Sequence, residues 1–254
     1  MDIGLYRLDR VDSTNRYAAD HYDELADGTL VYAVEQTAGR GRCGREWLAP
    51  RGMNICATLV MKRVTVPHLA AAVVGLSGLA LARTAVPGIP AYLKWPNDVY
   101  VCDRKLAGIL CETCRIEDGR ISGIAAGIGI NVNLSADDLA AVPLPATSLA
   151  VEAGRSFELE KMVAEFAFFL KQYYIIYSRC VADLCLEWKR ENRLIGQPLR
   201  LIREDGETVS GIFADIADDG SMLLDTPAGV QAFRSGDVRV DRESLIGKTG
   251  HWQY

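Results

Sequence analysis

A glycine-rich stretch of the chain, GRGRCGR at residues 39–45, carries three arginines close together. They are Arg40, Arg42 and Arg45. Glycine lets the backbone come close to a ligand and adopt positive φ. Arginine stays charged and binds carboxylate or phosphate through parallel hydrogen bonds. The stretch therefore predicts a mobile loop that binds an anion, whereas the ordinary interpretation of such a charge run is a solvated basic loop.

The charges of this loop predict how it behaves. Three guanidinium groups so close together repel one another, so we expect the loop to become ordered only when a polyanion binds. The glycines also match the dinucleotide-binding pattern G-x-G-x-x-G, which requires a following helix and an acidic residue about 20 residues later. A strand-like segment follows instead, and residues 60–68 contain no Asp or Glu. We therefore reject the dinucleotide-binding interpretation.

The rest of the chain is acidic. Its 254 residues have a formal net charge of -5 and a pI near 5.3, and 49% of them are hydrophobic. This is enough apolar material for a large core and a second small domain. Domains that coat nucleic acid are usually basic, so we expect no DNA partner. The arginine cluster is local and indicates a local anion.

The sequence contains no recognisable export or membrane signal. Its first ten residues lack the apolar run of a signal peptide. The uncharged run at residues 69–82 is too short to span a bilayer, and we interpret it as a buried core helix. Seven cysteines without a framework pattern fit a reduced compartment. We therefore expect a cytoplasmic protein without membrane contacts.

Apolar periodicity predicts an α+β fold for residues 1–193. Strands and helices mix without a regular βαβ order, which favours a mixed or mainly antiparallel sheet with helices on one face. Strands are expected at residues 29–36, 52–61, 91–95, 99–103, 105–113 and 120–133, and helices at 16–25, 68–85, 156–177 and 181–192.

The pattern of predicted elements changes after Asn192. Short strand-like segments, separated by turns such as Glu204-Asp205-Gly206, predict a small β-barrel. We place a domain boundary near Leu194. The expected organisation is a catalytic domain at residues 1–193, a barrel at 194–242 and a tail at 243–254.

Several short motifs resemble those of the biotin–protein ligases, the enzymes that attach biotin to carrier proteins. The arginine loop is similar to the family's GRGRxGR loop, with Cys43 where many relatives have a basic residue. The further motifs occur in the family's order and approximate spacing, and the C-terminal segment resembles its SH3-like barrel. They are DSTN (12–15), EQTAGRGR (35–42), KWPND (94–98), KLAGIL (105–110), GIGINVN (127–133) and PATSL (145–149).

The resemblance implies a class II synthetase-like catalytic domain and a two-step reaction. The carboxylate of biotin attacks the α-phosphate of ATP, with Mg²⁺ helping to bind the triphosphate, and pyrophosphate leaves. Biotinyl-5'-AMP then acylates a lysine of a biotin carboxyl carrier protein or domain. Cations must bring two anions together and stabilise the growing charge. A loop that folds over the intermediate excludes water.

The resemblance also assigns residues, which we take as predictions. The catalytic candidates are Lys105, Arg40 and Arg42. The biotin-binding candidates are Ser13, Thr14, Asn15, Gln36, Arg40, Gly41, Arg42, Lys105, Gly108, Ile109 and Gly127. The candidates for ATP or the adenylate are Arg40, Arg42, Arg45, Trp47, Asn97, Lys105 and Asn131. Trp95 is expected to join Ile109 in an apolar wall, and no protein metal ligand is predicted.

Each of these residues also has an ordinary structural interpretation. Ser13 could simply be a helix N-cap, although the capping-box partner is missing. Lys105 could be a surface lysine at a strand end, and Trp47 a core aromatic. Cys111 and Cys114 form C-x-x-C without a second pair at ligand spacing, so we interpret them as packing cysteines that point in different directions.

Three functions remain open at this stage. A biotin–protein ligase without repressor activity is expected, since about a dozen residues precede DSTN and no DNA-binding helix-turn-helix fits there. A lipoate or octanoyl ligase or transferase shares the catalytic fold. A non-catalytic protein that senses biotin is the third alternative. A homodimer is compatible with each of them.

Overall fold

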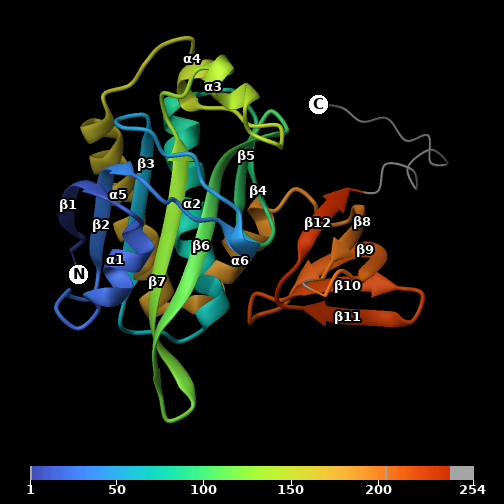
Figure 1. The fold of residues 1–254 in the computed structure, drawn as a ribbon. Coiled ribbons are helices and arrows are strands. Elements are labelled where there is room, and N and C mark those ends of the chain that lie inside the picture. Colours follow the sequence, from blue (N-terminus) through green and yellow to red (C-terminus); the bar gives the residue numbers. More distant parts are fainter. Residues whose placement is uncertain (1, 204, 241–254) are drawn as a thin grey trace.

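The computed structural model describes residues 2–203 and 205–240, which form two sheets and the helices packed on them (Figure 1). The larger sheet has the strand order β1-β2-β3-β7-β6-β5-β4. β1 and β2 are parallel and the other neighbours are antiparallel, so the predicted mixed sheet is confirmed. Its strands are β1 (Gly4–Val11), β2 (Thr29–Gln36), β3 (Asn54–Met61), β4 (Ala91–Lys94), β5 (Asp98–Val101), β6 (Arg104–Glu117) and β7 (Arg120–Asn131).

Three long helices cover one face of this sheet: α2 (Ala70–Ala85), α5 (Leu159–Arg179) and α6 (Val181–Glu191). α2 packs against both the sheet and α5, which explains why it is apolar on nearly every side. By length and composition alone, residues 67–85 could cross a membrane, but 67% of that window is buried inside the protein. The helix is thus the predicted core helix.

A short helix, α1 (Thr14–Asp20), lies on the opposite face. Alternate residues of a strand point to opposite faces, so Leu30 joins the core under the long helices while Val31 packs beneath α1. The expectation that helices occupy one face therefore holds for the long helices and not for α1. α1 also ends earlier than predicted, at Asp20.

Strand β1 was not predicted from the sequence. Most of its residues are exposed, so its sequence lacks the alternation of apolar and polar residues that predicts a half-buried strand. It pairs in parallel with β2, from Gly4 opposite Thr29 to Val11 opposite Gln36. This pairing brings residues 12–15, which directly follow β1, to the end of β2. It therefore places the DSTN motif beside Gln36.

The C-terminal residues form a separate five-stranded sheet in the order β11-β10-β9-β8-β12, as expected for a small barrel. Its core continues the core of the catalytic domain. Trp95 is 1% exposed, stacks edge-on against Phe213 and donates from Nε1 to the carbonyl of Gly220 at 3.0 Å. The strands are β8 (Pro198–Ile202), β9 (Thr208–Ile216), β10 (Met222–Thr226), β11 (Gly229–Phe233) and β12 (Asp237–Val240).

The position of Trp95 at this junction corrects one prediction. Trp95 was expected to line an apolar wall of the ligand site, but its ring is buried between the two domains. The expectation was wrong because the barrel supplies a packing partner that the motif does not reveal. The boundary near Leu194 stays a prediction. The proposed tail at residues 243–254 lies outside the described residues.

Candidate functional site

The site is built on glycines in the middle of the large sheet, on the face that carries α1. A Cβ atom at Gly127 would lie 1.9 Å from Asn15 Oδ1, and one at Gly129 would lie 2.3 Å from Trp47 Nε1. A Cβ at Gly108, which pairs with Gly129 from the neighbouring strand, would meet Trp47 and Lys105. We call Gly108, Gly127 and Gly129 the glycine platform. Any larger residue would push away what rests on it.

One end of the platform holds four of the predicted biotin-binding residues, which are Ser13, Thr14, Asn15 and Gln36. Ser13 caps α1, and its side chain accepts a hydrogen bond from the Arg16 amide. The backbone N–H and the hydroxyl of Thr14 both donate to Gln36 Oε1, at 2.7 and 3.0 Å. Ser13 therefore caps α1 and also lies next to Thr14 and Gln36, so its two interpretations are compatible.

Asn15 fastens this end of the site to the sheet. Its Nδ2 donates to the carbonyl of Leu110 and to Glu112 Oε2, both at 2.9 Å. Its Oδ1 accepts from the hydroxyl of Thr58 at 2.6 Å. Asn15 is 5% exposed and Thr58 is fully buried, so the hydrogen bond between them forms out of water. Thr58 and Glu112 are members of the site that the sequence analysis did not single out.

The arginine loop belongs to the connection from β2 to β3, which passes across β7 and β6 in Figure 1. Trp47 of the same connection rests on Gly108 and Gly129. The loop forms a narrow hairpin, in which Trp47 N donates to Gly39 O at 2.9 Å and Gly41 N donates to Arg45 O at 2.7 Å. A single 3₁₀ turn at Arg42–Gly44 forms its tip, with Cys43 exposed at φ 55°. No helix follows the glycines, which confirms that they are not a dinucleotide-binding motif.

Each loop arginine has a partner outside the loop. Arg40 Nη2 lies 3.1 Å from Glu112 Oε2. Arg42 Nη1 donates to Asn97 Oδ1 at 3.2 Å and to the carbonyl of Gly236 at 3.4 Å. Arg45 forms an ion pair with Asp237, a residue of β12 in the C-terminal sheet.

The ion pairs of Arg40 and Arg45 correct the prediction that the loop arginines only repel one another. We expected the three guanidinium groups to repel one another, but Glu112 and Asp237 each neutralise one of them. The Arg45 guanidinium, with smaller contributions from Lys94 and Arg42, holds the pKa of the Asp237 carboxyl below its ordinary value. Both acidic residues are distant from the loop in sequence, so the motif alone could not reveal them. That an anionic ligand orders the loop stays a prediction.

We expect Asp237→Asn to loosen the tip of the arginine loop. An exposed ion pair contributes up to about 1 kcal/mol, so the loop should open about twofold to fivefold more often. The initial rate of tryptic cleavage after the loop arginines, measured by mass spectrometry, should rise by that factor. Asp225→Asn, on an exposed position of β10, is the control and should leave the rate unchanged. Equal rates in both variants would show that the ion pair does not hold the loop.

The pH dependence of this contact follows from the lowered pKa of Asp237. Because the pKa is lower in the folded protein, the contact is complete above the ordinary carboxyl pKa and is lost as pH falls through the lowered value. Between pH 5 and 8 the carboxyl group of Asp237 should therefore stay ionised, and its titration should not change the rate of tryptic cleavage in the unmodified loop.

Lys105 lies at the other end of the platform, at the start of β6. In a regular strand Lys105 and Gly108 would point to opposite faces. A register shift opposite Val99 and Tyr100 breaks the alternation, and the side chain of Lys105 packs over Gly108. Its Nζ is 2.6 Å from Asp98 Oδ1 and 5.9 Å from the centre of the Trp47 ring. Lys105 is therefore a partly buried, ion-paired lysine and not an exposed strand-end residue.

A second lysine faces the same region. Lys94, from the KWPND motif, places Nζ 3.4 Å from the Tyr100 hydroxyl. Burial lowers the pKa of Lys94, and the negative charges of Asp98 and Asp237 partly oppose this effect. The sequence analysis did not name Lys94 as a site residue, although it stands in a motif that was recognised.

The two predicted asparagines occupy structural positions beside the site. Asn97 brackets Ile109, because its Nδ2 donates to Ile109 O at 2.9 Å and its carbonyl accepts from Ile109 N at 2.8 Å. Asn131 accepts from Asn54 Nδ2 at 3.2 Å and donates to Thr147 O at 2.9 Å. Through these bonds both asparagines hold backbone segments beside the site in place.

The structure does not bring the side chain of Ile109 to the platform. That side chain points to the other face, where its Cδ1 packs against Gly75 of α2. Gly108 faces the loop, and its neighbour in the strand must face away. The prediction that Ile109 supplies an apolar wall was therefore wrong for its side chain.

The C-x-x-C pair is confirmed as two packing cysteines. Cys111 packs in the large core and Cys114 packs in the smaller cluster under α1, on opposite faces of the sheet. Burial raises the pKa of Cys111 to about 12 and also raises that of Cys114. Both thiols stay protonated at neutral pH. Across residues 2–203 and 205–240, no group of three or more His, Cys, Asp or Glu side chains could hold a metal ion.

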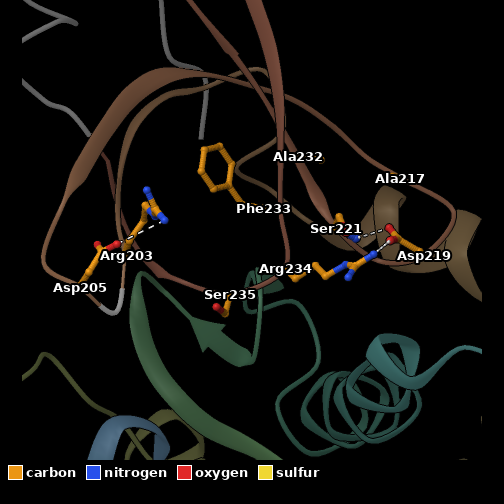
Figure 2. A pocket seen from close by; sticks show the side chains of 9 residues that line it. All are labelled: Arg203, Asp205, Ala217, Asp219, Ser221, Ala232, Phe233, Arg234 and Ser235. Atoms are coloured by element: carbon orange, nitrogen blue, oxygen red, sulfur yellow. Dashed lines mark hydrogen bonds and ion pairs between the residues drawn. The ribbon is translucent and has the colours of Figure 1, made fainter. Parts of the chain in front are cut away.

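An open cavity of about 810 Å³ lies on the C-terminal sheet (Figure 2). Its charged side chains pair with each other: Arg203 with Asp205, and Arg234 with Asp219. None of the predicted site residues lines it.

Two family models match the chain. Residues 8–131 match the biotin/lipoate A/B protein ligase family, and residues 194–240 match the biotin protein ligase C-terminal domain. Among solved structures, the biotin protein ligase from Aquifex aeolicus in complex with biotin and ATP has a TM-score of 0.78. It shares 24% identity over 94% of this chain and 99% of that chain, and at this identity it supports the fold.

Curated relatives match along nearly the whole chain. The biotin–[acetyl-CoA-carboxylase] ligase of Paracoccus denitrificans is 33% identical over 238 residues, which cover 91% of this chain and 98% of the relative. The ligase of the same name from Mycobacterium tuberculosis is 31% identical and covers 92% and 89%. The bifunctional ligase/repressor BirA of Escherichia coli is 31% identical and covers 90% and 71%. On this similarity of sequence and fold, the chain belongs to the biotin protein ligase family.

Proposed function

We propose that this chain is a biotin–protein ligase that uses ATP to attach biotin to a lysine of a biotin carboxyl carrier protein. One observation carries the proposal. The glycine platform has hydrogen-bonding groups for a ureido ring at one end and Lys105 at the other, and the arginine loop lies across it. Gly127 and Gly129 are two residues apart, roughly 7 Å along the strand, which gives the scale of the distance that a ligand reaching both ends would span.

Biotin binding would use the Thr14 end of the platform. The ureido group offers one carbonyl acceptor and two N–H donors. The hydroxyls of Ser13 and Thr14 and the amide of Gln36 can both donate and accept, so they can satisfy both kinds of group. The ligand's valeryl chain would then run beside Asn15 and Trp47, which rest on the platform glycines, toward Lys105.

Adenylation would take place at the Lys105 end. A carboxylate oxygen of biotin attacks the α-phosphorus of ATP, the bond to the bridging oxygen breaks, and pyrophosphate leaves. The Lys105 ammonium would hold the carboxylate against the α-phosphate and stabilise the charge that develops there. Arg40, Arg42 and Arg45 would balance the remaining negative charge, exchanging part of their contact with Glu112 and Asp237 for the ligand.

Acyl transfer would follow on the same platform. The neutral amine of the carrier lysine attacks the acyl carbon of biotinyl-5'-AMP, AMP leaves with the bonding electrons, and the new amide loses a proton. Trp47 and the loop would cover the mixed anhydride until the carrier arrives and so exclude water. Mg²⁺ would be bound mainly through phosphate oxygens and water, as is usual for nucleotide enzymes.

The direct test is pyrophosphate release. The purified chain is incubated with ATP and Mg²⁺, and with biotin, lipoate or no acid. We expect release with biotin only. Release with lipoate only would identify a lipoate ligase, and release with neither acid would favour a non-catalytic biotin-sensing protein. The carrier step is then tested by transfer of biotin to a recombinant biotin carboxyl carrier domain, with its acceptor lysine changed to arginine as the control.

Arg42→Ala should weaken biotin binding and increase leakage of the adenylate. The change removes both the hydrogen bond to Asn97 and the bond to the Gly236 carbonyl, which together fix the loop tip. A charge-assisted hydrogen bond contributes about 1.5–3 kcal/mol, so we expect the dissociation constant to rise about tenfold to a hundredfold. Calorimetry measures binding, and the rate of biotin release from preformed adenylate measures leakage. Unchanged values would make this loop an ordinary surface segment.

Further features remain predictions for this chain. They are a cytoplasmic location, the absence of a DNA partner, the absence of repressor activity and the formation of a homodimer. Sedimentation of the protein with and without biotin and ATP measures the oligomeric state directly.

A further inference from the structure

Thr147 stands between Lys105, which the proposed mechanism uses, and Asn131, which is a predicted adenylate-binding residue. It is fully buried in the segment that leads into helix α4 (Leu149–Ala153). Its backbone N–H donates to Lys105 O at 2.9 Å, and its carbonyl accepts from Asn131 Nδ2 at 2.9 Å. Two residues earlier, the carbonyl of Pro145 accepts from Lys105 N, also at 2.9 Å. Residues 145–147 thus form a short parallel bridge that holds the backbone of Lys105 from both sides.

The side chain of Thr147 is held in turn by Glu152. The Glu152 carboxylate is 6% exposed, and its Oε1 accepts from Thr147 Oγ1 at 2.5 Å and from Arg104 Nη2 at 2.7 Å. Arg104 directly precedes Lys105 in the chain. The three residues therefore link α4 to both the backbone and the sequence neighbour of the proposed catalytic lysine.

A buried carboxylate needs specific partners, because it has lost the water that would otherwise stabilise its charge. Glu152 has two such partners, and each leads to Lys105 by a short route. This arrangement has a cost that packing alone would not require, since an apolar side chain could fill the same space. Neither Thr147 nor Glu152 lies on the platform itself, so neither is placed to touch a ligand.

We propose that Thr147 and Glu152 are positioning residues that fix Lys105 and Asn131 relative to each other during adenylate formation. The inference rests on the proposed function, because it assigns Lys105 to that step. Displacement of a catalytic group by about 1 Å can lower a rate roughly a hundredfold. The bridge at residues 145–147 sets the position of Lys105 at that scale, and the hydroxyl of Thr147 fixes the bridge to the buried carboxylate.

The test compares three substitutions in one segment. Thr147→Val keeps the shape and the backbone bonds but removes the hydroxyl. Thr147→Ser restores the hydroxyl. Ser148→Ala is the matched control, because the equally buried neighbour uses its side chain to cap α4 through Val151 N and to donate to Leu134 O at 2.6 Å, while its link to Glu152 is a backbone bond that the change keeps. Biotin-dependent ATP–pyrophosphate exchange gives kcat and KM, a burst titration gives the fraction of active sites, and thermal unfolding gives the stability.

We expect kcat per active site to fall roughly tenfold to a hundredfold in Thr147→Val, with both KM values within twofold, and to recover in Thr147→Ser. Ser148→Ala should lower the unfolding temperature without changing kcat per active site. If Thr147→Val does not fold, Glu152→Gln decides, with an expected fall of about fivefold to twentyfold and the same unchanged KM values.

Two results would overturn the inference. One is a kcat per active site that is unchanged in Thr147→Val, or in Glu152→Gln when that variant decides. The other is an equal loss in Ser148→Ala, because this would show a general effect of loosening the segment. If the unmodified chain itself shows no biotin-dependent exchange, the proposed function fails, and that outcome is separate from failure of the positioning role.

Discussion

Lys105→Ala should reduce biotin-dependent pyrophosphate exchange by about a thousandfold or more, with the fold retained. Removal of a single group that stabilises developing charge typically lowers kcat by about 10² to 10³. Lys105 also aligns the two reactants in the proposed mechanism, which adds to the loss. Its backbone bonds to residues 145–147 do not involve the side chain, so the strand should keep its place. Exchange kinetics and circular dichroism measure the two effects separately.

The control for this variant must address Asp98, which would lose its ion-pair partner in a partly buried position. The double variant Lys105→Ala/Asp98→Asn removes the unpaired charge. It should regain the thermal stability that the single variant loses, and it should stay inactive. A near-normal rate in Lys105→Ala, or recovered activity in the double variant, would remove Lys105 from the mechanism.

Gly129→Ala should prevent the arginine loop from closing on the platform. A Cβ atom there would lie 2.3–2.8 Å from three atoms of the Trp47 indole, and a rigid ring cannot avoid it without moving as a whole. Because the loop is expected to position the adenylate, adenylate formation should slow by roughly a hundredfold. Exchange kinetics measure this loss, and tryptic cleavage after the loop arginines should become faster in the same variant.

Gly4→Ala is the matched control for this change. Gly4 lies at the start of β1, where an added Cβ atom would meet no other segment of the chain within 4 Å, and its φ angle is ordinary. The same chemical change should leave both kinetics and cleavage unaltered there. Normal exchange and cleavage in Gly129→Ala would show that Trp47 does not need to rest on the platform.

Much of the site was predictable because its motifs are contiguous in the sequence. The strands that carry KLAGIL and GIGINVN, and the helix N-cap at Ser13, follow from local patterns of apolar, glycine and capping residues. The mixed sheet followed from the order of the elements. Strand β1 was missed because it is largely exposed on the sheet edge, where neither face imposes an alternating pattern.

The parts that could not be predicted depend on contacts between distant segments. Nothing around Glu112 marks it as the partner of Arg40, which lies 72 residues earlier. Asp237, in the C-terminal sheet, contacts Arg45, which lies 192 residues earlier. The orientations of Trp95 and Ile109 depended in the same way on the barrel and on α2. Local sequence patterns define which residues are available, and tertiary packing decides which of them meet.

The shared core between the two domains has a consequence for dissecting the protein. Cutting the chain at Leu194 would uncover the indole of Trp95 and leave its N–H without the Gly220 carbonyl. It would also take away Asp237 and the Gly236 carbonyl, which hold the tip of the arginine loop. A truncated catalytic fragment should therefore be prone to aggregate and slow to react, and exchanging barrels between relatives should succeed only when these contacts are transplanted as a set.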